Sequence, residues 1–281
     1  MKALIVTADD FGLSPEVNRA VELAHTRGIL SAASLMVSGP AVADAIERAR
    51  RLPTLRVGLH LALVDARPTL PPAELPDFVD GNGWLRGDLA ALGTQIFLRP
   101  KMREQLAAEI AAQFDAFAAT GLPLDHVNAH HHFHVHPTVA GAVINAGRQH
   151  GLRALRVPRE PLPVLDAIEP GRKHARDWRM GPWLALLGTR ARAHGLLVPD
   201  RVFGLAWSGA MTERRLAGLL HRLPAGVTEI YAHPATTNEF AGATPGYRYK
   251  DELDALTARE IRDAAHASGA RIGGFGDFLS S

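Results

Sequence analysis

Histidines crowd one short stretch of the sequence, VNAHHHFHVHP at residues 127–137. With the residue just upstream, this region holds six of the 14 histidines in the chain: His126, His130, His131, His132, His134 and His136. Imidazole nitrogens bind divalent metals and exchange protons near neutral pH. The stretch therefore predicts a metal site or an acid/base site. A purification tag is excluded, since the histidines lie inside the chain between patterned segments.

Other side chains that could complete such a site lie elsewhere in the chain. Asp9 and Asp10 are adjacent, His60 interrupts the apolar run GLHLAL, Arg156 lies in RVP, and His233 lies in YAHP. Two neighbouring carboxylates stay ionised together when a cation is close, so one could bind a metal while the other acts as a base. One or two imidazoles beside a carboxylate are typical of a catalytic metal with an open position.

Each of these residues also has a structural interpretation. Asp10 could cap the helix that follows it, and His60 could be a hydrogen-bonded core residue. Arg156 could form a plain surface ion pair. His233 precedes Pro234, and a residue before proline often marks the exit from a strand.

Not every ring of the histidine stretch can bind the same metal. An extended chain and the start of a helix would both place His130 and His134 on one face, so either could be the ligand. We expect His131 and His136 to face solvent.

The composition narrows the class of protein. The chain has 281 residues, no cysteine, 47% hydrophobic and 21% charged residues, and a formal net charge of +2. Nucleic-acid binding is not indicated, and disulfides, thiolate zinc sites and a cysteine nucleophile are excluded. No apolar window is long enough to span a membrane, and the N-terminus lacks a signal-peptide pattern, so we expect a cytoplasmic protein. Peripheral contact with the inner membrane and a homodimer both stay open.

Short apolar runs alternate with segments of helical periodicity along the whole chain. The runs predict strands at 3–8, 32–37, 55–63, 124–129, 153–158, 201–207, 227–233 and 271–275. The periodic segments predict helices at 15–27, 41–51, 102–119, 137–150, 183–193, 212–223 and 251–268. Such a pattern is typical of a parallel α/β sheet. We expect one domain over 1–281, a (β/α) barrel that is distorted or incomplete with about seven parallel strands, and a doubly wound open sheet is the alternative.

Parallel α/β folds place their chemistry at the carboxyl ends of the strands, and the polar residues follow that rule. In a barrel, Asp9, Asp10, His60, the histidine stretch, Arg156 and His233 would meet at one mouth. Two irregular stretches, at about 65–100 and 159–180, are predicted to form lids over it. Their aromatic residues could bind a sugar or lipid face, or simply fill the core: Phe78, Trp84, Phe97 and Trp178.

Four motifs together resemble a known family. VTADDFGLS, VGLHL, HVNAHHHFHVHP and YAHP are similar to the YdjC/ChbG family of carbohydrate N-deacetylases, distant relatives of NodB-type polysaccharide deacetylases. The resemblance extends from Lys2 to the terminal GGFGDFL. The stretches LPLDHVNAH and RVPREP look most similar to the HpnK branch, whose members are associated with hopanoid biosynthesis.

The resemblance implies a metal-dependent deacetylase with one divalent ion, zinc or magnesium. It implies Asp10, His60 and His130 as metal ligands, with His134 in reserve. It further implies Asp9 as base, held by Arg156, and His233 as general acid.

The implied substrate is an N-acetylglucosamine unit on a hopanoid glycolipid, or alternatively a chito-oligosaccharide. One residue departs from the family pattern: Asn128 stands where many members have Asp. A different metal-dependent hydrolase, for example of phosphoesters, and a non-enzymatic metal-binding protein are the other interpretations.

Overall fold

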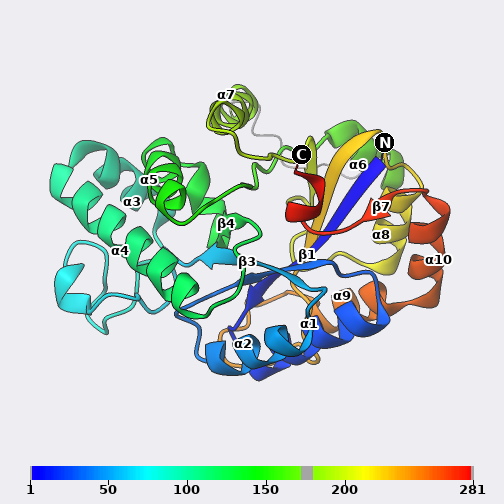
Figure 1. Cartoon of the computed structure of the whole chain (residues 1–281), viewed down its shortest axis with the longest axis horizontal. Coiled ribbons are helices and arrows are strands. Elements are labelled where there is room, and N and C mark those ends of the chain that lie inside the picture. The colour runs from blue at the N-terminus through cyan, green and yellow to red at the C-terminus, as the bar shows by residue number, and fades with distance from the viewer. Residues whose placement is uncertain (1, 172–179, 280–281) are drawn as a thin grey trace.

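The computed structural model describes residues 2–171 and 180–279, and its strands form one curled parallel sheet (Figure 1). The sheet has seven strands in the order β4-β3-β2-β1-β6-β5, and β7 pairs with β1. The strands are β1 (Lys2–Phe11), β2 (Ala32–Leu35), β3 (Arg56–Leu61), β4 (Val127–Ala129), β5 (Arg201–Phe203), β6 (Gly226–Ala232) and β7 (Arg271–Ile272). The fold is therefore the predicted α/β half-barrel, a distorted (β/α) barrel.

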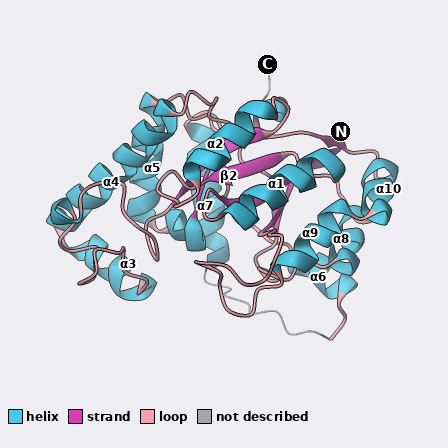
Figure 2. Cartoon of the chain, turned by 90° about the horizontal axis from the view of Figure 1, so that it is seen from below, coloured by secondary structure: helices cyan, strands magenta, loops and turns pink. Residues whose placement is uncertain are grey.

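Helices cover the outside of this sheet, and α1 and α2 lie across it next to β2 (Figure 2). The helices are α1 (Pro15–Arg27), α2 (Val42–Arg51), α3 (Leu89–Leu98), α4 (Pro100–Ala119), α5 (Pro137–Gln149), α6 (Leu162–Ile168), α7 (Met180–Ala193), α8 (Glu213–Leu220), α9 (Tyr249–Thr257) and α10 (Arg259–Ala267). None of the helices in the described ranges has both the length and the apolar character needed to cross a membrane.

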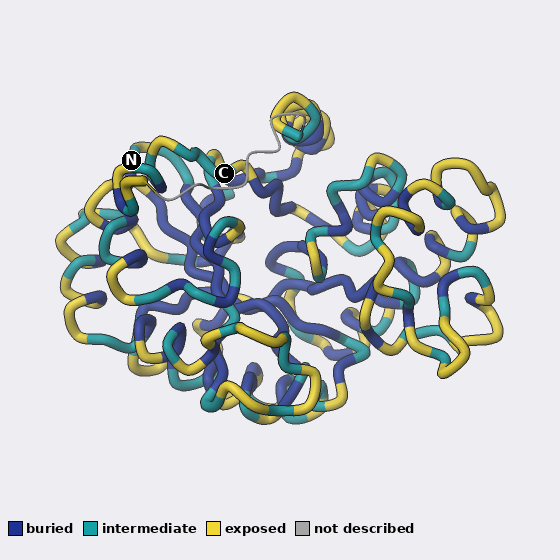
Figure 3. Tube along the Cα trace, turned by 180° about the vertical axis from the view of Figure 1, so that it is seen from behind, coloured by how far each residue is buried: buried dark blue, intermediate teal, exposed yellow. Residues whose placement is uncertain are grey.

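The central strand β1 is covered on both faces of the sheet. Every residue from Ala3 to Phe11 is buried, as the continuous apolar run predicts for a parallel strand (Figure 3). The chain then turns into α1, where the Ser14 hydroxyl accepts a hydrogen bond from the Val17 amide at 3.3 Å and caps the helix. Core residues of α1 pack beneath the sheet, and β1 is thereby fixed at the centre of the molecule.

The prediction of a regular strand at 153–158 is wrong. Ala154 and Leu155 form only isolated bridges, to Leu197 and Val127 respectively. Beyond them, Pro158 and Pro161 lack the amide proton that a ladder needs. The segment still spans the open side of the barrel, since the Arg159 carbonyl accepts a hydrogen bond from the Val202 amide at 3.0 Å.

The two irregular stretches contain more structure than predicted. The first includes a short 3₁₀ turn (Pro72–Glu74) and α3, and the second includes α6. Residues 172–179 of the second stretch, with Trp178, lie outside the described residues.

The helix predicted at 251–268 is two helices, α9 and α10. They are separated by Ala258, whose backbone is extended at φ −59° and ψ 141°. No proline or glycine marks this break, which is why helical periodicity alone missed it.

Candidate metal centre and catalytic site

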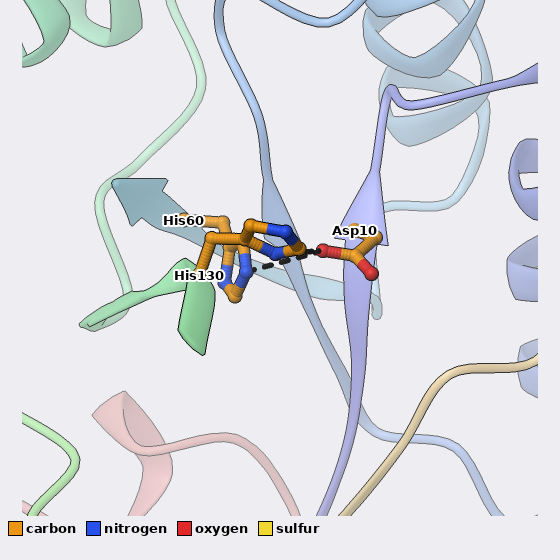
Figure 4. A group of neighbouring side chains, drawn as sticks. All are labelled: Asp10, His60 and His130. Atoms are coloured by element: carbon orange, nitrogen blue, oxygen red, sulfur yellow. Dashed lines mark hydrogen bonds and ion pairs between the residues drawn. The ribbon is translucent and has the colours of Figure 1, made fainter. Parts of the chain in front are cut away.

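Three side chains from three strand ends meet in the barrel mouth. Asp10 lies at the end of β1, His60 in β3, and His130 directly after β4, and their ligand atoms all lie within 4.8 Å of one another (Figure 4). The Asp10 Oδ1 atom is 3.2 Å from His60 Nε2 and 3.1 Å from His130 Nδ1. The predicted convergence of these residues is confirmed, and this group could hold a metal ion.

The backbone around Asp10 is built to turn its carboxylate into the mouth. The pairing of β1 with β2 shifts register between Ala8 and Phe11, as in a β-bulge. Asp10 itself is left-handed at φ 62°, a conformation that aspartate tolerates better than most residues. The buried Asn18 of α1 stabilises the turn by accepting a hydrogen bond from the Gly12 amide at 2.8 Å.

The histidine stretch is neither extended nor α-helical. Residues His130–Val135 form a 3₁₀ turn in which His131 and His132 are left-handed, so successive rings point in different directions. The Nε2 atoms of His132 and His134 each lie 2.8 Å from an oxygen, of the Tyr231 hydroxyl and the Arg156 carbonyl respectively. The expectation that His130 and His134 share a face is therefore wrong, because neither regular geometry forms, and His134 lies outside the metal-binding group.

The outer histidines of the stretch differ in exposure. His131 is exposed, as predicted, and its Nε2 atom is 3.5 Å from a carboxylate oxygen of Asp65. His136 is only partly exposed, because its ring packs against Gly93 of α3.

Hydrogen bonding around His60 indicates that a cation fits between these side chains. The His60 Nδ1 atom is 2.7 Å from the Asn128 Oδ1 atom, so Nδ1 carries the ring proton. Nε2 then presents a lone pair toward the Asp10 carboxylate, is fully buried and makes no hydrogen bond. Two facing acceptors in a buried place repel unless a cation or proton lies between them. Two imidazoles and a carboxylate are also the protein ligands of many catalytic zinc sites.

Electrostatics within the group favour the same arrangement. Burial alone would raise the pKa of the Asp10 carboxyl, but His130 outweighs it and holds that pKa well below its usual range. Burial would likewise lower the pKa of His130, yet the Asp10 carboxylate raises it. The group thus stabilises positive charge beside Asp10, as a metal site must.

Asp9 is held by a buried arginine on the other side of the strand. The Arg156 guanidinium donates to both Asp9 oxygens, at 2.5 and 3.0 Å, and to Glu229 Oε1 at 2.9 and 2.6 Å. Burial would raise the pKa of Asp9, but the charge and hydrogen bonds of Arg156 hold it well below its usual range. Arg156 is fully buried, so its interpretation as a surface ion pair is wrong.

Two partners in this network were not identified from the sequence. Glu229 is a fully buried carboxylate, and the only signal for it was a charge within the apolar strand VTEIYAH. Tyr231, two residues later, places its ring 4.4 Å from the Arg156 guanidinium carbon. Both lie in β6, beside β1, so the sheet brings them to Asp9.

Asn128 connects the two halves of the site. Its amide nitrogen donates to Asp9 Oδ1 at 3.0 Å, while its carbonyl oxygen accepts from His60. The Asn128 nitrogen must face Asp9, because a carboxylate can only accept. The residue that departs from the family pattern is thus fully integrated into this site.

His233 lies at the end of β6, near Asp9. Its backbone amide donates to the Glu252 carboxylate, and its ring lies 5.2 Å from the Tyr247 ring. A positive charge on His233 lowers the pKa of Asp9, so the two side chains are close enough to interact electrostatically. The buried Nδ1 atom of His233 makes no hydrogen bond to the described residues. An imidazole near Asp9 is thus available for proton transfer.

Known proteins match the chain over nearly its whole length. A family model described as YdjC-like protein matches residues 3–267. A carbohydrate deacetylase of Brevibacillus brevis is 31% identical over 265 residues, 94% of each chain. A carbohydrate deacetylase of Enterococcus faecalis is 26% identical over 284 residues, 98% of this chain and 97% of the relative.

Solved structures share the fold over nearly the whole chain. A crystal structure from Enterococcus faecalis, of a protein named for cellobiose-phosphate cleavage, matches with a TM-score of 0.77 at 25% identity over 99% of both chains. The lactam utilization protein of Thermus thermophilus shares the fold alone, with a TM-score of 0.52 at 17% identity over 98% of this chain and 100% of that one. On the match to the family model and to the Brevibacillus brevis relative, the chain belongs to the YdjC-like protein family.

Proposed function

We propose that this chain is a metal-dependent carbohydrate N-deacetylase that hydrolyses the acetamide of an N-acetylglucosamine unit. The buried group of Asp10, His60 and His130 directly beside the ionised Asp9 carries this proposal. The curated relatives support it, because carbohydrate deacetylases align with more than nine-tenths of the chain.

The reaction adds water to the amide carbonyl, breaks the C–N bond, and releases acetate and a free amine. A divalent cation bound to the group would supply a Lewis acid and lower the pKa of a water molecule at its open position. Asp9 takes the proton that the attacking water loses, and Arg156 and Asn128 fix its orientation. His233 donates a proton to the departing amine nitrogen. Because the pKa of Asp9 is held low, its carboxylate alone would be a weak base. Asp9 would therefore need the neighbouring cation site, where a bound cation would lower the pKa of the water.

The ligand set favours zinc over magnesium in this proposal. Two of the three ligands are imidazoles, which suit zinc, whereas magnesium prefers an all-oxygen octahedral shell. Magnesium stays the alternative that the family resemblance implies.

Two cavities provide room for a sugar, and each reaches a histidine of the site through one residue that lines it. One, of about 440 Å³, is lined in part by Phe240 and Tyr247 and adjoins His233 through the Tyr247 ring. Another, of about 470 Å³, is lined in part by Asp65 and Trp84 and lies beyond His131. Aromatic faces next to carboxylates suit a hydroxyl-rich pyranose ring.

We assign the sugar to a hopanoid glycolipid, following the sequence similarity to the HpnK branch. Exposed apolar side chains support a lipid-linked substrate and peripheral contact with a membrane: Phe97 and Leu98 of α3 are 65% and 69% exposed, and Leu186 of α7 is 58% exposed. We propose the cytoplasmic side of the inner membrane as the place of that contact. Phe78, by contrast, is buried and belongs to the core. In this proposal the chain is a single domain over 1–281, and the stretch 65–100 and the described part of the stretch 159–180, up to residue 171, act as lids.

Mass spectrometry tests the substrate directly. Zinc-loaded protein is incubated with N-acetylglucosaminyl-hopanoid and, in parallel, with di-N-acetylated chitobiose, and the loss of one acetyl group is followed. We expect faster deacetylation of the glycolipid. Deacetylation of chitobiose alone would overturn the hopanoid assignment and leave the deacetylase, whereas deacetylation of neither substrate would contradict both.

Phosphoester hydrolysis is disfavoured by the charge pattern at the mouth. Arg156 is committed to Asp9 and Glu229, so it is not free to bind a phosphate. A protein that merely stores metal would not need the buried Arg156–Asp9 pair or His233 beside the group.

A further inference from the structure

Beneath the metal-binding group lies a continuous line of buried polar side chains, of which the proposed mechanism uses only Asn128. It runs from Asn128 through Ser34 and His126 to Asp125, and none of the four side chains is more than 8% exposed. Asn128 Nδ2 is 2.9 Å from Ser34 Oγ, Ser34 Oγ is 3.0 Å from His126 Nε2, and His126 Nδ1 is 2.9 Å from Asp125 Oδ2.

The direction of every hydrogen bond in this line is fixed from its far end. The Asp125 carboxylate accepts from the backbone amides of Phe275 and Gly276, at 3.0 and 2.8 Å, and from His126 Nδ1. Because Nδ1 of His126 carries the proton, its Nε2 accepts from the Ser34 hydroxyl. The Ser34 oxygen is then left to accept from the Asn128 amide.

At the other end of the line, the hydrogen bonds of Asn128 are fixed in the same way. The second N–H of the Asn128 amide donates to Asp9, which leaves its carbonyl oxygen to accept from His60 Nδ1. His60 is thereby held in the tautomer whose Nε2 lone pair faces Asp10. Second partners of this kind typically fix the orientation of metal-binding histidines.

The neighbouring strand makes room for this line. A Cβ atom at Gly58 of β3 would lie 2.5 Å from the His126 ring, so only glycine lets the imidazole occupy this position. On its other side the His126 ring stacks on Phe275 at 4.2 Å. The ring is therefore held by packing as well as by its two hydrogen bonds.

We propose that Asn128 is a positioning residue that presents His60 Nε2 to the cation and orients the Asp9 carboxylate, and that Ser34, His126 and Asp125 hold its amide in that orientation. The part concerning Asp9 rests on the proposed deacetylase function, whereas the part concerning His60 concerns metal binding alone. A carboxylate at position 128 could still accept from His60, but it could donate to neither Asp9 nor Ser34. Asn128→Asp would therefore keep the contact that positions His60 and lose the contact that orients Asp9, so the two roles can be measured separately.

The test measures zinc affinity by competition with a chromophoric chelator, and kcat and KM separately. We expect Asn128→Leu to weaken zinc binding by about 10- to 100-fold. Asn128→Asp should bind zinc more tightly than Asn128→Leu, because its carboxylate still accepts from His60, yet lose kcat at little changed KM because the contact to Asp9 is lost. Asn145→Leu and Asn145→Asp, on the exposed face of α5, are the matched controls and should change neither quantity.

A double-mutant cycle tests the rest of the line. Ser34→Ala should weaken zinc binding on its own and have no further effect in the Asn128→Leu background. Wild-type zinc affinity in Asn128→Leu, or a full additional effect of Ser34→Ala in that background, would overturn the proposal. If Asn128→Leu does not fold, Ser34→Ala and Asn128→Asp still decide it. Zinc affinities that follow this pattern in a protein without deacetylase activity would contradict the proposed function and not the positioning of His60.

Discussion

At the scale of single residues, the site depends on the buried guanidinium group of Arg156. Arg156 is the only described partner that neutralises both Asp9 and Glu229, and all three side chains are at most 2% exposed. Removing one member of a buried charge network leaves the others unpaired in a low dielectric, which costs far more than losing a surface pair. Arg156 therefore contributes to stability as well as to the orientation of Asp9.

Arg156→Met should lower the free energy of unfolding by roughly 3–5 kcal/mol. The control is Arg51→Met, which removes an exposed pair with Glu47 and should cost about 0–1 kcal/mol. Urea denaturation of the metal-free proteins at pH 7 measures both values. Equal losses in the two variants would contradict the role given to the Arg156 network.

His233→Gln should lower kcat for an N-acetyl sugar by about 10²- to 10⁴-fold, the usual contribution of a general acid, with little change in KM. The metal content should not change, because His233 is not in the metal-binding group. His150→Gln, a change at the partly exposed pair of His150 with Asp115, is the control and should leave kcat intact. Loss of bound metal in His233→Gln, or an unchanged kcat, would argue against the role of proton donor.

Single residues also mark the limit of what could be predicted from the sequence. Strand-end positions were sufficient to bring Asp10, His60 and His130 together. They were not sufficient to orient the histidine stretch, because the left-handed backbone at His131 and His132 has no glycine to signal it. Glu229 was missed for a related reason, since a buried charge becomes interpretable only when its partner Arg156 is seen beside it.

At the scale of elements, the carboxyl ends of β1, β3, β4 and β6 position the site, and the C-terminal segment supports it from below. Alternation of apolar runs and helical segments predicted the order of these elements well. The regular strand at 153–158 and the single helix at 251–268 were wrong, because tertiary pairing decides where a short run becomes a ladder and where a helix breaks. α3 was missed because its apolar residues lie in a segment rich in proline and glycine.

Asp125 ties the C-terminal segment to β4, and its contribution should depend on pH. Burial would raise the pKa of Asp125, but the hydrogen bond from His126 and the amides of Gly276 and Phe275 hold it below its usual value of 3.8. A lowered folded-state pKa stabilises the protein above the unfolded-state pKa, and this stabilisation is lost as the pH falls through the folded-state pKa.

Asp125→Asn should therefore destabilise the protein by a constant amount between pH 8 and about pH 5, and by progressively less below about pH 4. Urea denaturation across this range gives the difference in the free energy of unfolding. Asp263→Asn is the control, because the Asp263 side chain is 72% exposed and its partner Arg259 stays charged throughout this range. A difference that grows toward acid pH would have the wrong sign for this contact.

At the scale of the whole molecule, a cation in the mouth would link strands that are not all neighbours in the sheet, because its ligands come from β1, β3 and the turn after β4. A ligand that binds only the folded state stabilises it by mass action. Zinc at 100 times its Kd should therefore add about 2.7 kcal/mol to the free energy of unfolding.

Thermal denaturation with and without zinc measures this effect as a rise in Tm. The rise should disappear in Asp10→Asn and persist in Asp65→Asn, whose carboxylate contacts His131 outside the group. An equal rise in Asp10→Asn would place the bound zinc elsewhere in the chain.

The central claim is that Asp10, His60 and His130 hold one metal ion that is required to hydrolyse an acetamide. Acetate release from an N-acetylglucosamine conjugate, measured beside the metal content of the same samples, tests it most directly. We predict one tightly held ion per wild-type chain, and loss of both the ion and acetate release after chelation and in the Asp10→Asn and His130→Ala variants. Undiminished acetate release by those variants, with no metal bound, would contradict it.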